Sequence, residues 1–150
     1  MLNQLKDVFA SLEKYKVRYL VIGGIASVLY GVPRATFDLD ILIETTSENA
    51  NSLLAAFLEV NLGTAALTTA EELLSHEITI FQDRVRIDVQ TKTPGINFEE
   101  AWRNRKIMDF HGQKFSVLSK EDLISSKLAS GRDVDLEDVR LLRLSKNNAN

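Results

Sequence analysis

The chain has 150 residues, of which 45% are hydrophobic and 26% are charged, as expected of one ordinary globular domain. A chain of this length buries roughly 70% of its unfolded surface, so it can fold without a disulfide or a structural metal. It contains no cysteine, which excludes thiol catalysis, thiolate zinc sites and disulfides. Its net charge of −3 argues against a wholly basic nucleic-acid-binding surface, although not against a local basic groove.

Apolar periodicity, capping residues and glycines predict helices and strands that alternate along the chain. Helices are predicted over residues 2–15, 25–30, 47–59, 98–103, 119–131 and 134–144. Strands are predicted over residues 17–22, 37–43, 77–81, 84–91, 107–110 and 114–118. We expect Ser47 to cap the third helix and residues 82–83 to form a tight turn, whereas residues 61–70 are ambiguous.

Strands and helices interleave, but several of the strands are joined as hairpins. The expected fold class is therefore α/β (α+β), with a mixed β-sheet flanked by helices and a short helical extension at the C-terminus. We expect a single domain over residues 1–144 and a disordered polar tail over residues 145–150.

The uncharged stretches of the chain are too short to span a membrane. The longest, residues 19–33, has fifteen residues, against the ~20 that a spanning helix needs, and glycines and a proline interrupt it. Charges are spread through the N-terminal apolar positions, unlike in a secretory signal. We expect no membrane partner and a cytoplasmic location.

Asp38 and Asp40 are the clearest candidate for a chemical site. Side chains alternate along a strand, so both carboxylates lie on one face, ~6.6 Å apart at their Cα atoms. The opposite face carries Phe37, Leu39, Ile41 and Ile43. Two like charges on a rigid strand repel each other without a cation. The alternative is a solvated face at the end of a strand.

A third acid, Asp88, lies on a later strand, where the same alternation gives it a polar face shared with Arg84, Arg86 and Gln90. If this strand lies beside the Asp38 strand, three carboxylates converge. Hard divalent cations prefer such oxygen-only sites, and Mg²⁺ keeps positions open for phosphate oxygens. Two such ions ~4 Å apart would activate a hydroxyl and stabilise a leaving pyrophosphate. Taken alone, Asp88 is better explained as an ordinary strand acid.

Gly23 and Gly24 stand between a buried strand and a helix. Glycine there lets backbone N–H groups approach a phosphate at the helix N-terminus. A simple tight turn is the alternative. The chain lacks both the three-glycine dinucleotide fingerprint and the P-loop, so nucleotide binding would follow another scheme.

Together these residues form a recognisable spacing: Ile22-Gly23-Gly24, thirteen residues, Asp38-Leu39-Asp40-Ile41, and later Ile87-Asp88-Val89. The spacing resembles that of the polymerase-beta-like nucleotidyltransferase superfamily. The run Arg34-Ala35-Thr36-Phe37-Asp38 resembles its AbiEii-like branch of abortive-infection and toxin–antitoxin nucleotidyltransferases more closely. The likeness covers about residues 17–90, and residues 127–138 resemble the C-terminal motifs of the branch more loosely.

The resemblance implies an enzyme that uses Mg²⁺ (or Mn²⁺) to transfer a nucleoside monophosphate from an NTP donor to a hydroxyl acceptor. The implied acceptor is RNA, such as a tRNA end, or a protein side chain, with a cognate toxin or antitoxin or a homodimer as partner. A non-catalytic nucleotide-binding regulator and a small-molecule nucleotidyltransferase of the aminoglycoside type are the alternatives.

The resemblance also implies roles for single residues. Asp38 and Asp40 would hold the metals, and Asp88 would complete the metal site and help to activate the acceptor hydroxyl. Gly23 and Gly24 would contact the triphosphate. Residues expected to steady phosphate or ribose are Arg34, Thr36 and Arg132, with Ser27 as a substitute for the serine that Gly24 replaces.

Lys127 is implied as a further catalytic residue. It lies on a helical stripe with Leu123 and Ile124, so this buried cation needs a partner, which we expect on the acidic strand face. The alternative for Lys127 is a side chain that snorkels to the surface. For Ser27 the alternative is an ordinary position on a helix surface, and for Arg34 it is an ordinary charged residue in a loop. Asp135 and Asp138 are expected either to orient Lys127 and Arg132 or to cap the last helix.

Overall fold

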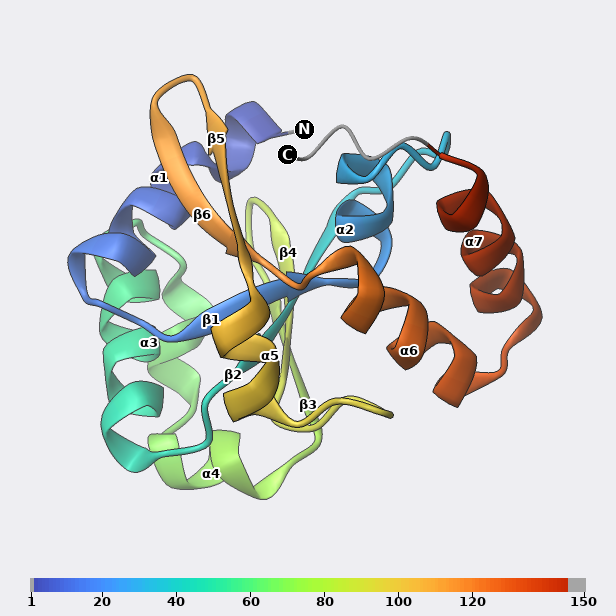
Figure 1. Ribbon diagram of the computed structural model, residues 1–150. Helices are drawn as coiled ribbons and strands as arrows, with labels where there is room; N and C mark the ends of the chain where they lie inside the picture. The colour runs from blue at the N-terminus through green and yellow to red at the C-terminus, as the bar shows by residue number, and fades with distance from the viewer. Residues whose placement is uncertain (1, 146–150) are drawn as a thin grey trace.

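The computed structural model describes residues 2–145 and shows a six-stranded mixed sheet flanked by helices (Figure 1). The strands are β1 (Tyr19–Ile22), β2 (Asp38–Ile43), β3 (Ile78–Gln82), β4 (Arg86–Gln90), β5 (Lys106–Phe110) and β6 (Gln113–Val117). The helices are α1 (Leu2–Lys14), α2 (Gly23–Leu29), α3 (Ser47–Glu59), α4 (Ala70–Ser75), α5 (Phe98–Asn104), α6 (Lys120–Ser130) and α7 (Asp133–Leu144). The expected fold class is confirmed.

The sheet has the strand order β3-β4-β2-β1-β6-β5. β1 is antiparallel to β2 and parallel to β6, β2 is parallel to β4, and the two hairpins β3–β4 and β5–β6 form the edges. Of the expected disordered tail at residues 145–150, Ser145 is ordered, and its carbonyl oxygen accepts a hydrogen bond from Lys120 Nζ at 3.0 Å. Residues 146–150 lie outside the described residues.

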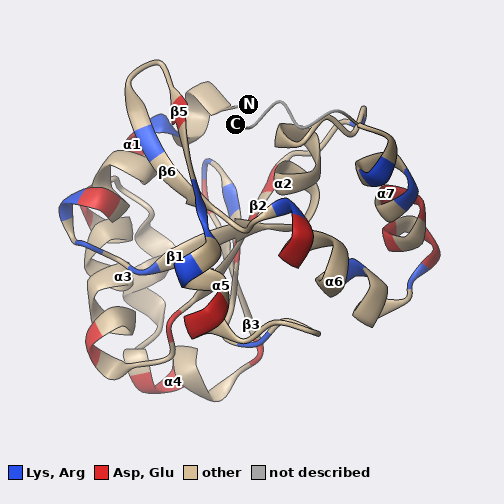
Figure 2. Cartoon of the chain, viewed as in Figure 1, with Lys and Arg blue, Asp and Glu red and all other residues tan. Residues whose placement is uncertain are grey.

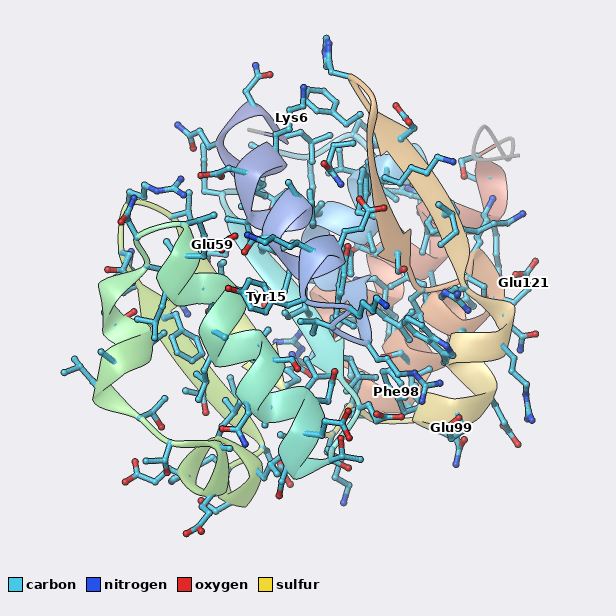
Figure 3. All side chains as sticks on the ribbon, turned by 90° about the vertical axis from the view of Figure 1, so that its left-hand side faces the viewer. Lys6, Tyr15, Glu59, Phe98, Glu99 and Glu121 are labelled. Carbon is cyan, nitrogen blue, oxygen red and sulfur yellow. The ribbon has the colours of Figure 1, made fainter. Side chains whose placement is uncertain are left out.

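Helices cover the two faces of the sheet unequally. In Figure 1, α1, α3 and α4 lie on one side of the sheet, and α2, α6 and α7 lie on the other. The first group packs on a continuous apolar layer, in which Phe57 of α3 meets Phe81 of β3 edge to face, with ring centroids 5.1 Å apart. The hydroxyl of Tyr15 at the end of α1 donates to Glu59 of α3 at 3.1 Å and links these helices at the surface (Figure 3).

Burial alternates along β2, β4 and β3 because only one face of these strands is fully covered. Leu39 and Ile41 of β2 and Ile87 and Val89 of β4 are fully buried, whereas the residues between them on β4 are only partly buried. The polar side chains of β2 and β4 that point to the other face are Asp38, Asp40, Arg86, Asp88 and Gln90, and Leu42 of β2 is buried on that same face beyond Asp40. The fold thus places an ionised row on one open face of the sheet.

The expected cap of the third helix is wrong by one residue. Thr46 is the N-cap, and its hydroxyl oxygen accepts a hydrogen bond from the Asn49 backbone N–H at 3.1 Å, while Ser47 is already helical. Two adjacent hydroxyl residues satisfy the same capping rule, so the pattern could not distinguish them. The ambiguous stretch 61–70 contains a 3₁₀ helix, η1 (Gly63–Leu67).

The ends of two strands also differ from expectation. β3 ends at Gln82 and β4 begins at Arg86, so the tight turn runs over residues 83–85 and not 82–83. Phe37 precedes β2 and is 83% exposed, so it does not join the apolar face of that strand. None of the helices within residues 2–145 is both long and apolar enough to cross a membrane.

Candidate active site

Two carboxylates from different parts of the sequence meet on the open face of the sheet. β2 and β4 pair in parallel with Asp40 opposite Asp88 and Asp38 opposite Arg86. Adjacent strands lie ~4.8 Å apart, so the side chains of a register pair are direct neighbours. The expectation that the Asp88 strand lies beside the Asp38 strand is confirmed.

The Asp40 carboxyl is the electrostatically unusual group of this site. Burial raises its pKa to about 7, and the negative charges of Asp88 and then Asp38 add to the rise. A hydrogen bond between the Asp40 and Asp88 side chains acts in the same direction, whereas the nearby Arg86 charge opposes it. The Asp40 carboxyl therefore titrates near neutral pH, far above the usual range of an aspartate.

Arg86 is a member of the site whose contacts the sequence did not reveal. Its Nε and Nη2 donate to the two oxygens of Asp88 at 2.9 and 3.2 Å, and its Nε lies 3.6 Å from Asp38 Oδ2. The hydrogen bond to Asp88 is the main reason that the pKa of Arg86 is raised. The Arg-x-Asp spacing on one strand face was the available signal, because residues two apart on a strand point the same way.

Arg84 does not belong to this face, contrary to expectation. It lies in the turn before β4, and its Nη2 pairs with Asp7 of α1 at 2.5 Å. Strand alternation could not hold at Arg84 because the strand begins two residues later.

Gly23 lies directly against the side chain of Asp40. Its φ of +69° is in the left-handed region, and a Cβ at this position would lie 2.5 Å from Asp40 Oδ2. Both the turn from β1 into α2 and the close approach of the carboxylate therefore require glycine. Gly24 is similarly crowded, since a Cβ there would lie 3.0 Å from Thr36 Oγ1. Gly23, Gly24 and Thr36 thus form one side of the site together.

Ser27 is fully buried, so the alternative of a helix-surface serine is wrong. Its hydroxyl donates to the Gly23 carbonyl oxygen at 3.2 Å, one helical turn back. This contact supports the glycine turn from within the helix.

Lys127 is buried, which excludes the snorkelling alternative, but its partners are not the strand acids. Its Nζ lies 2.9 Å from Asp138 Oδ2 and 3.4 Å from Asp135 Oδ1, and both acids belong to α7. Of the two roles expected for Asp135 and Asp138, contact with the cations is the one that the structure shows. A helical stripe shows that a cation is buried but not which element faces it.

Arg34 joins the same network from the loop before β2. Its Nη2 lies 2.8 Å from Asp138 Oδ1, and the side chain of Asp138 is fully buried. This oxygen makes no aligned hydrogen bond within residues 2–145, so the contact is mainly Coulombic. Arg34 is therefore more than an ordinary loop charge: one buried carboxylate joins it to Lys127.

Arg132, the N-cap residue of α7, holds a guanidinium that is 73% exposed. Its Nε donates to Asp135 Oδ2 at 2.7 Å. That hydrogen bond is the main cause of its raised pKa, and the charge of Asp40 contributes to the same shift. The guanidinium is therefore within electrostatic reach of the strand acids.

A cavity of about 100 Å³ lies between the glycine turn that follows β1 and the charged side chains of the C-terminal helices. Gly23, Gln90, Lys127, Arg132 and Asp135 are among the residues that line it. The structure thus brings Gly23 of the strand–helix turn next to Lys127 and Arg132. These two positively charged side chains line one side of the cavity, close to the carboxylates.

The donor set suits a hard divalent cation in chemistry. Carboxylate oxygens are the ligands that Mg²⁺ prefers. The raised pKa of Asp40 comes first from burial and then from the charges of Asp88 and Asp38, and a cation would relieve this repulsion. As the side chains stand, no group of three or more His, Asp or Glu residues within 2–145 could hold a metal ion. Arg86 pairs with Asp88 and lies near Asp38, so its guanidinium competes with a cation for the same oxygens.

The fold is similar to that of solved nucleotidyltransferase structures. A proposed nucleotidyltransferase from Thermotoga maritima gives a TM-score of 0.59 at 19% identity, over 95% of this chain and 92% of the other. An antigenic nucleotidyltransferase-like protein from Paracoccidioides brasiliensis gives 0.59 at 17% identity, over 93% and 73%. The lincosamide antibiotic adenylyltransferase LnuA, solved with lincomycin, gives 0.50 at 17% identity, over 88% and 89%. These identities support a shared fold only.

Comparison at the level of sequence gives one informative result. A family model described as "Nucleotidyltransferase of unknown function (DUF6036)" matches residues 1–148. No curated protein matches the sequence.

Proposed function

The chain belongs to the DUF6036 family of nucleotidyltransferases of unknown function, and from this premise we propose that it transfers a nucleoside monophosphate from an NTP to a hydroxyl acceptor with Mg²⁺ or Mn²⁺. The observation that carries the proposal is the register pair of Asp40 and Asp88, packed against the left-handed turn at Gly23. A solvated strand face would not raise the pKa of one carboxyl to about 7.

Asp38, Asp40 and Asp88 would hold the metal, which when bound polarises the phosphates and lowers the pKa of the attacking hydroxyl. In the transfer, the acceptor oxygen bonds to the α-phosphorus while the bond between that phosphorus and the α–β bridging oxygen breaks. Pyrophosphate leaves, and the hydroxyl proton passes to Asp88. Asp88 can accept this proton only after Arg86 has released it.

The residues that line the cavity would bind the triphosphate. Backbone N–H groups at Gly23 and Gly24 approach phosphate closely because no side chain intervenes. Lys127 and Arg132 would neutralise phosphate charge across the cavity, and Asp135 keeps Arg132 in place. Thr36 would contact ribose or phosphate beside Gly24, Arg34 acts through Asp138, and Ser27 supports the turn.

The motif around Arg34 also supports assignment to the AbiEii-like branch, and with it a toxin–antitoxin or abortive-infection context. In that context the acceptor is an RNA end or a protein side chain, and a cognate partner or a second copy completes the acceptor site. The fold shared with a lincosamide adenylyltransferase keeps a small hydroxylated molecule as the second class of acceptor.

A non-catalytic nucleotide-binding regulator is the second candidate function. The pairing of Arg86 with Asp88 favours it, because a guanidinium already compensates the carboxylate charge without a metal. A regulator would bind NTP and keep this pair intact.

One experiment separates these functions. The protein is incubated with each α-labelled NTP, Mg²⁺ and either total cell RNA or lysate, with Asp40→Asn as the matched control. We expect label on one acceptor class with the wild type and none with the variant. Melting temperatures are measured in parallel with Mg²⁺ and NTP. A rise in melting temperature without any transferred label would support the regulator and contradict the enzyme.

A further inference from the structure

β3 forms one edge of the sheet and lies directly beside the candidate active site. Its register places Ile80 opposite Asp88, which itself lies opposite Asp40, so the three side chains form a row on the open face. Ile78, one row further, lies opposite Gln90. Ile78 and Ile80 are 51% and 52% exposed. An uncovered apolar strip therefore adjoins the carboxylate that would take the acceptor proton.

The outer edge of β3 has free main-chain groups at these same residues. The Thr91 N–H donates to the Glu77 carbonyl oxygen at 2.9 Å, and the Asp83 N–H donates to Val85 at 3.1 Å. In an antiparallel pair, hydrogen-bonded and non-hydrogen-bonded positions alternate, so residues 79 and 81 bond to β4. Residues 78, 80 and 82 therefore turn their N–H and C=O groups outward.

The 3₁₀ helix η1 lies near β3, and the Thr64 backbone N–H of η1 donates to Asp83 directly after the strand, but no further strand pairs with the outer edge within residues 2–145. β3 has the sequence Ile-Thr-Ile-Phe-Gln, without a charge or a proline. No other strand pairs with its outer side in the described part of the chain, and no further backbone hydrogen bond reaches residues 78–82 there. An edge of this kind is a template for pairing with an extended segment.

The negative charge of the chain around β3 indicates what kind of segment could pair with its outer edge. Residues 35–83 contain nine acidic residues and not one lysine or arginine. Glu77, directly before β3, is exposed, as are Glu71 and Glu72 of the preceding helix α4, and Figure 2 shows acidic but no basic colour on α4. The nearest cation in register, Arg86, is already paired with Asp88. RNA binding depends on cations that neutralise phosphates, so this edge suits a basic polypeptide instead.

We propose that the outer edge of β3 binds an extended, basic polypeptide segment as an additional strand, and that a tyrosine of this segment accepts the nucleotide. The acceptor role rests on the proposed function, whereas the docking does not. The added strand would lie about 10 Å, two inter-strand spacings, from β4, which is too far for a serine. A tyrosine opposite Ile80 can pack its ring across that side chain and direct its hydroxyl towards Asp88.

Transfer to the tyrosine forms one bond and breaks one bond at the α-phosphorus. The phenolic oxygen bonds to the α-phosphorus, the bond from that phosphorus to the α–β bridging oxygen breaks, pyrophosphate leaves, and the phenolic proton passes to Asp88. The product is a tyrosine esterified with a nucleoside monophosphate.

The probe for the test is a short synthetic peptide in which lysine and valine alternate around one tyrosine. Companion peptides carry phenylalanine for the tyrosine or glutamate for the lysines. Binding is measured by fluorescence anisotropy without NTP, on wild type, Asp40→Asn, Ile78→Lys and Glu77→Lys. Ile107→Lys is the matched control, since Ile107 is 53% exposed on β5 at the opposite edge of the sheet. Thermal unfolding checks that each variant is folded.

We expect wild type, Asp40→Asn and Ile107→Lys to bind the lysine peptide equally, and Ile78→Lys and Glu77→Lys to bind it at least ~10-fold more weakly. With α-labelled NTP and Mg²⁺, label should enter the tyrosine peptide but not its phenylalanine version. Equal binding by all variants, or tighter binding of the glutamate peptide, would overturn the docking. Binding without label on any acceptor would refute the acceptor role together with the proposed function. Label on RNA that Ile78→Lys leaves unchanged would overturn the acceptor role alone.

Discussion

Replacing Asp40 by Asn should stabilise the metal-free protein at neutral and higher pH. The Asp40 pKa rises from 3.8 to about 7 on folding, so the folded state keeps a proton that the unfolded chain loses in between. Stability from this group is complete below pH 3.8 and falls as the pH rises towards 7. Asparagine keeps the shape, carries no charge and does not titrate.

The size of the effect follows from the shift. About 3 pKa units correspond to an upper limit of about 4 kcal/mol, at ~1.4 kcal/mol per unit. Because Asp40 is only partly buried and Arg86 offsets part of the repulsion, we expect about half of this, about 2 kcal/mol above pH 7. A domain of this size gains roughly 2–4 °C in melting temperature per kcal/mol, so the gain is about 4–8 °C.

The assay is urea unfolding of wild type and Asp40→Asn in EDTA across the range from about pH 4 to 8. Asp38→Asn is the matched control, because Asp38 lies on the same strand face with a side chain that is 46% exposed and well solvated. The stability of the wild type should fall with pH relative to Asp40→Asn, and the two should converge near pH 4. An Asp40→Asn gain that is the same at every pH, or no gain at all, would refute the electrostatic reasoning.

Three other perturbations test the rest of the site. Millimolar Mg²⁺ with NTP should raise the melting temperature of the wild type but hardly that of Asp40→Asn, and equal shifts would mean that the acids are not one metal site. Asp38→Asn should lower nucleotide transfer by more than ~10²-fold in the labelling assay, a result that full activity would contradict. Lys127→Met leaves the buried Asp138 without its lysine, so urea unfolding should show a loss of about 3 kcal/mol. In a folded sample, Lys127→Met should also lower specific transfer, and unchanged specific activity would make Lys127 purely structural.

Sequence periodicity was sufficient for the strands, the open acidic face and every helix except the short α4, because these depend on local spacing and on which side chains avoid water. The pairing of Asp40 with Asp88 needed one further assumption, the adjacency of β2 and β4, which the structure confirms. Placing Arg84 on the acidic face failed because alternation does not show where a strand begins.

The partners of buried charges were the main part that the sequence could not supply. Lys127 was expected to meet the strand acids, but α7 folds back on α6 and brings Asp138 to it instead. Both arrangements satisfy the same requirement for a counter-charge, and only the packing angle of two helices decides between them. Arg86 posed the same problem, since its face was predictable while its preference for Asp88 depends on rotamers.

The contact of Arg34 and Lys127 with Asp138 has a consequence for synthesis on the ribosome. The chain emerges from its N-terminus, so the acids of β2 and β4 are complete long before α7. Until Asp138 has emerged, Arg34 and Lys127 lack the carboxylate that joins them, and the cavity beside Gly23 lacks Asp135 from its wall. Nascent chains and products of premature termination before α7 would thus lack both the carboxylate that joins these two cations and one side of the cavity.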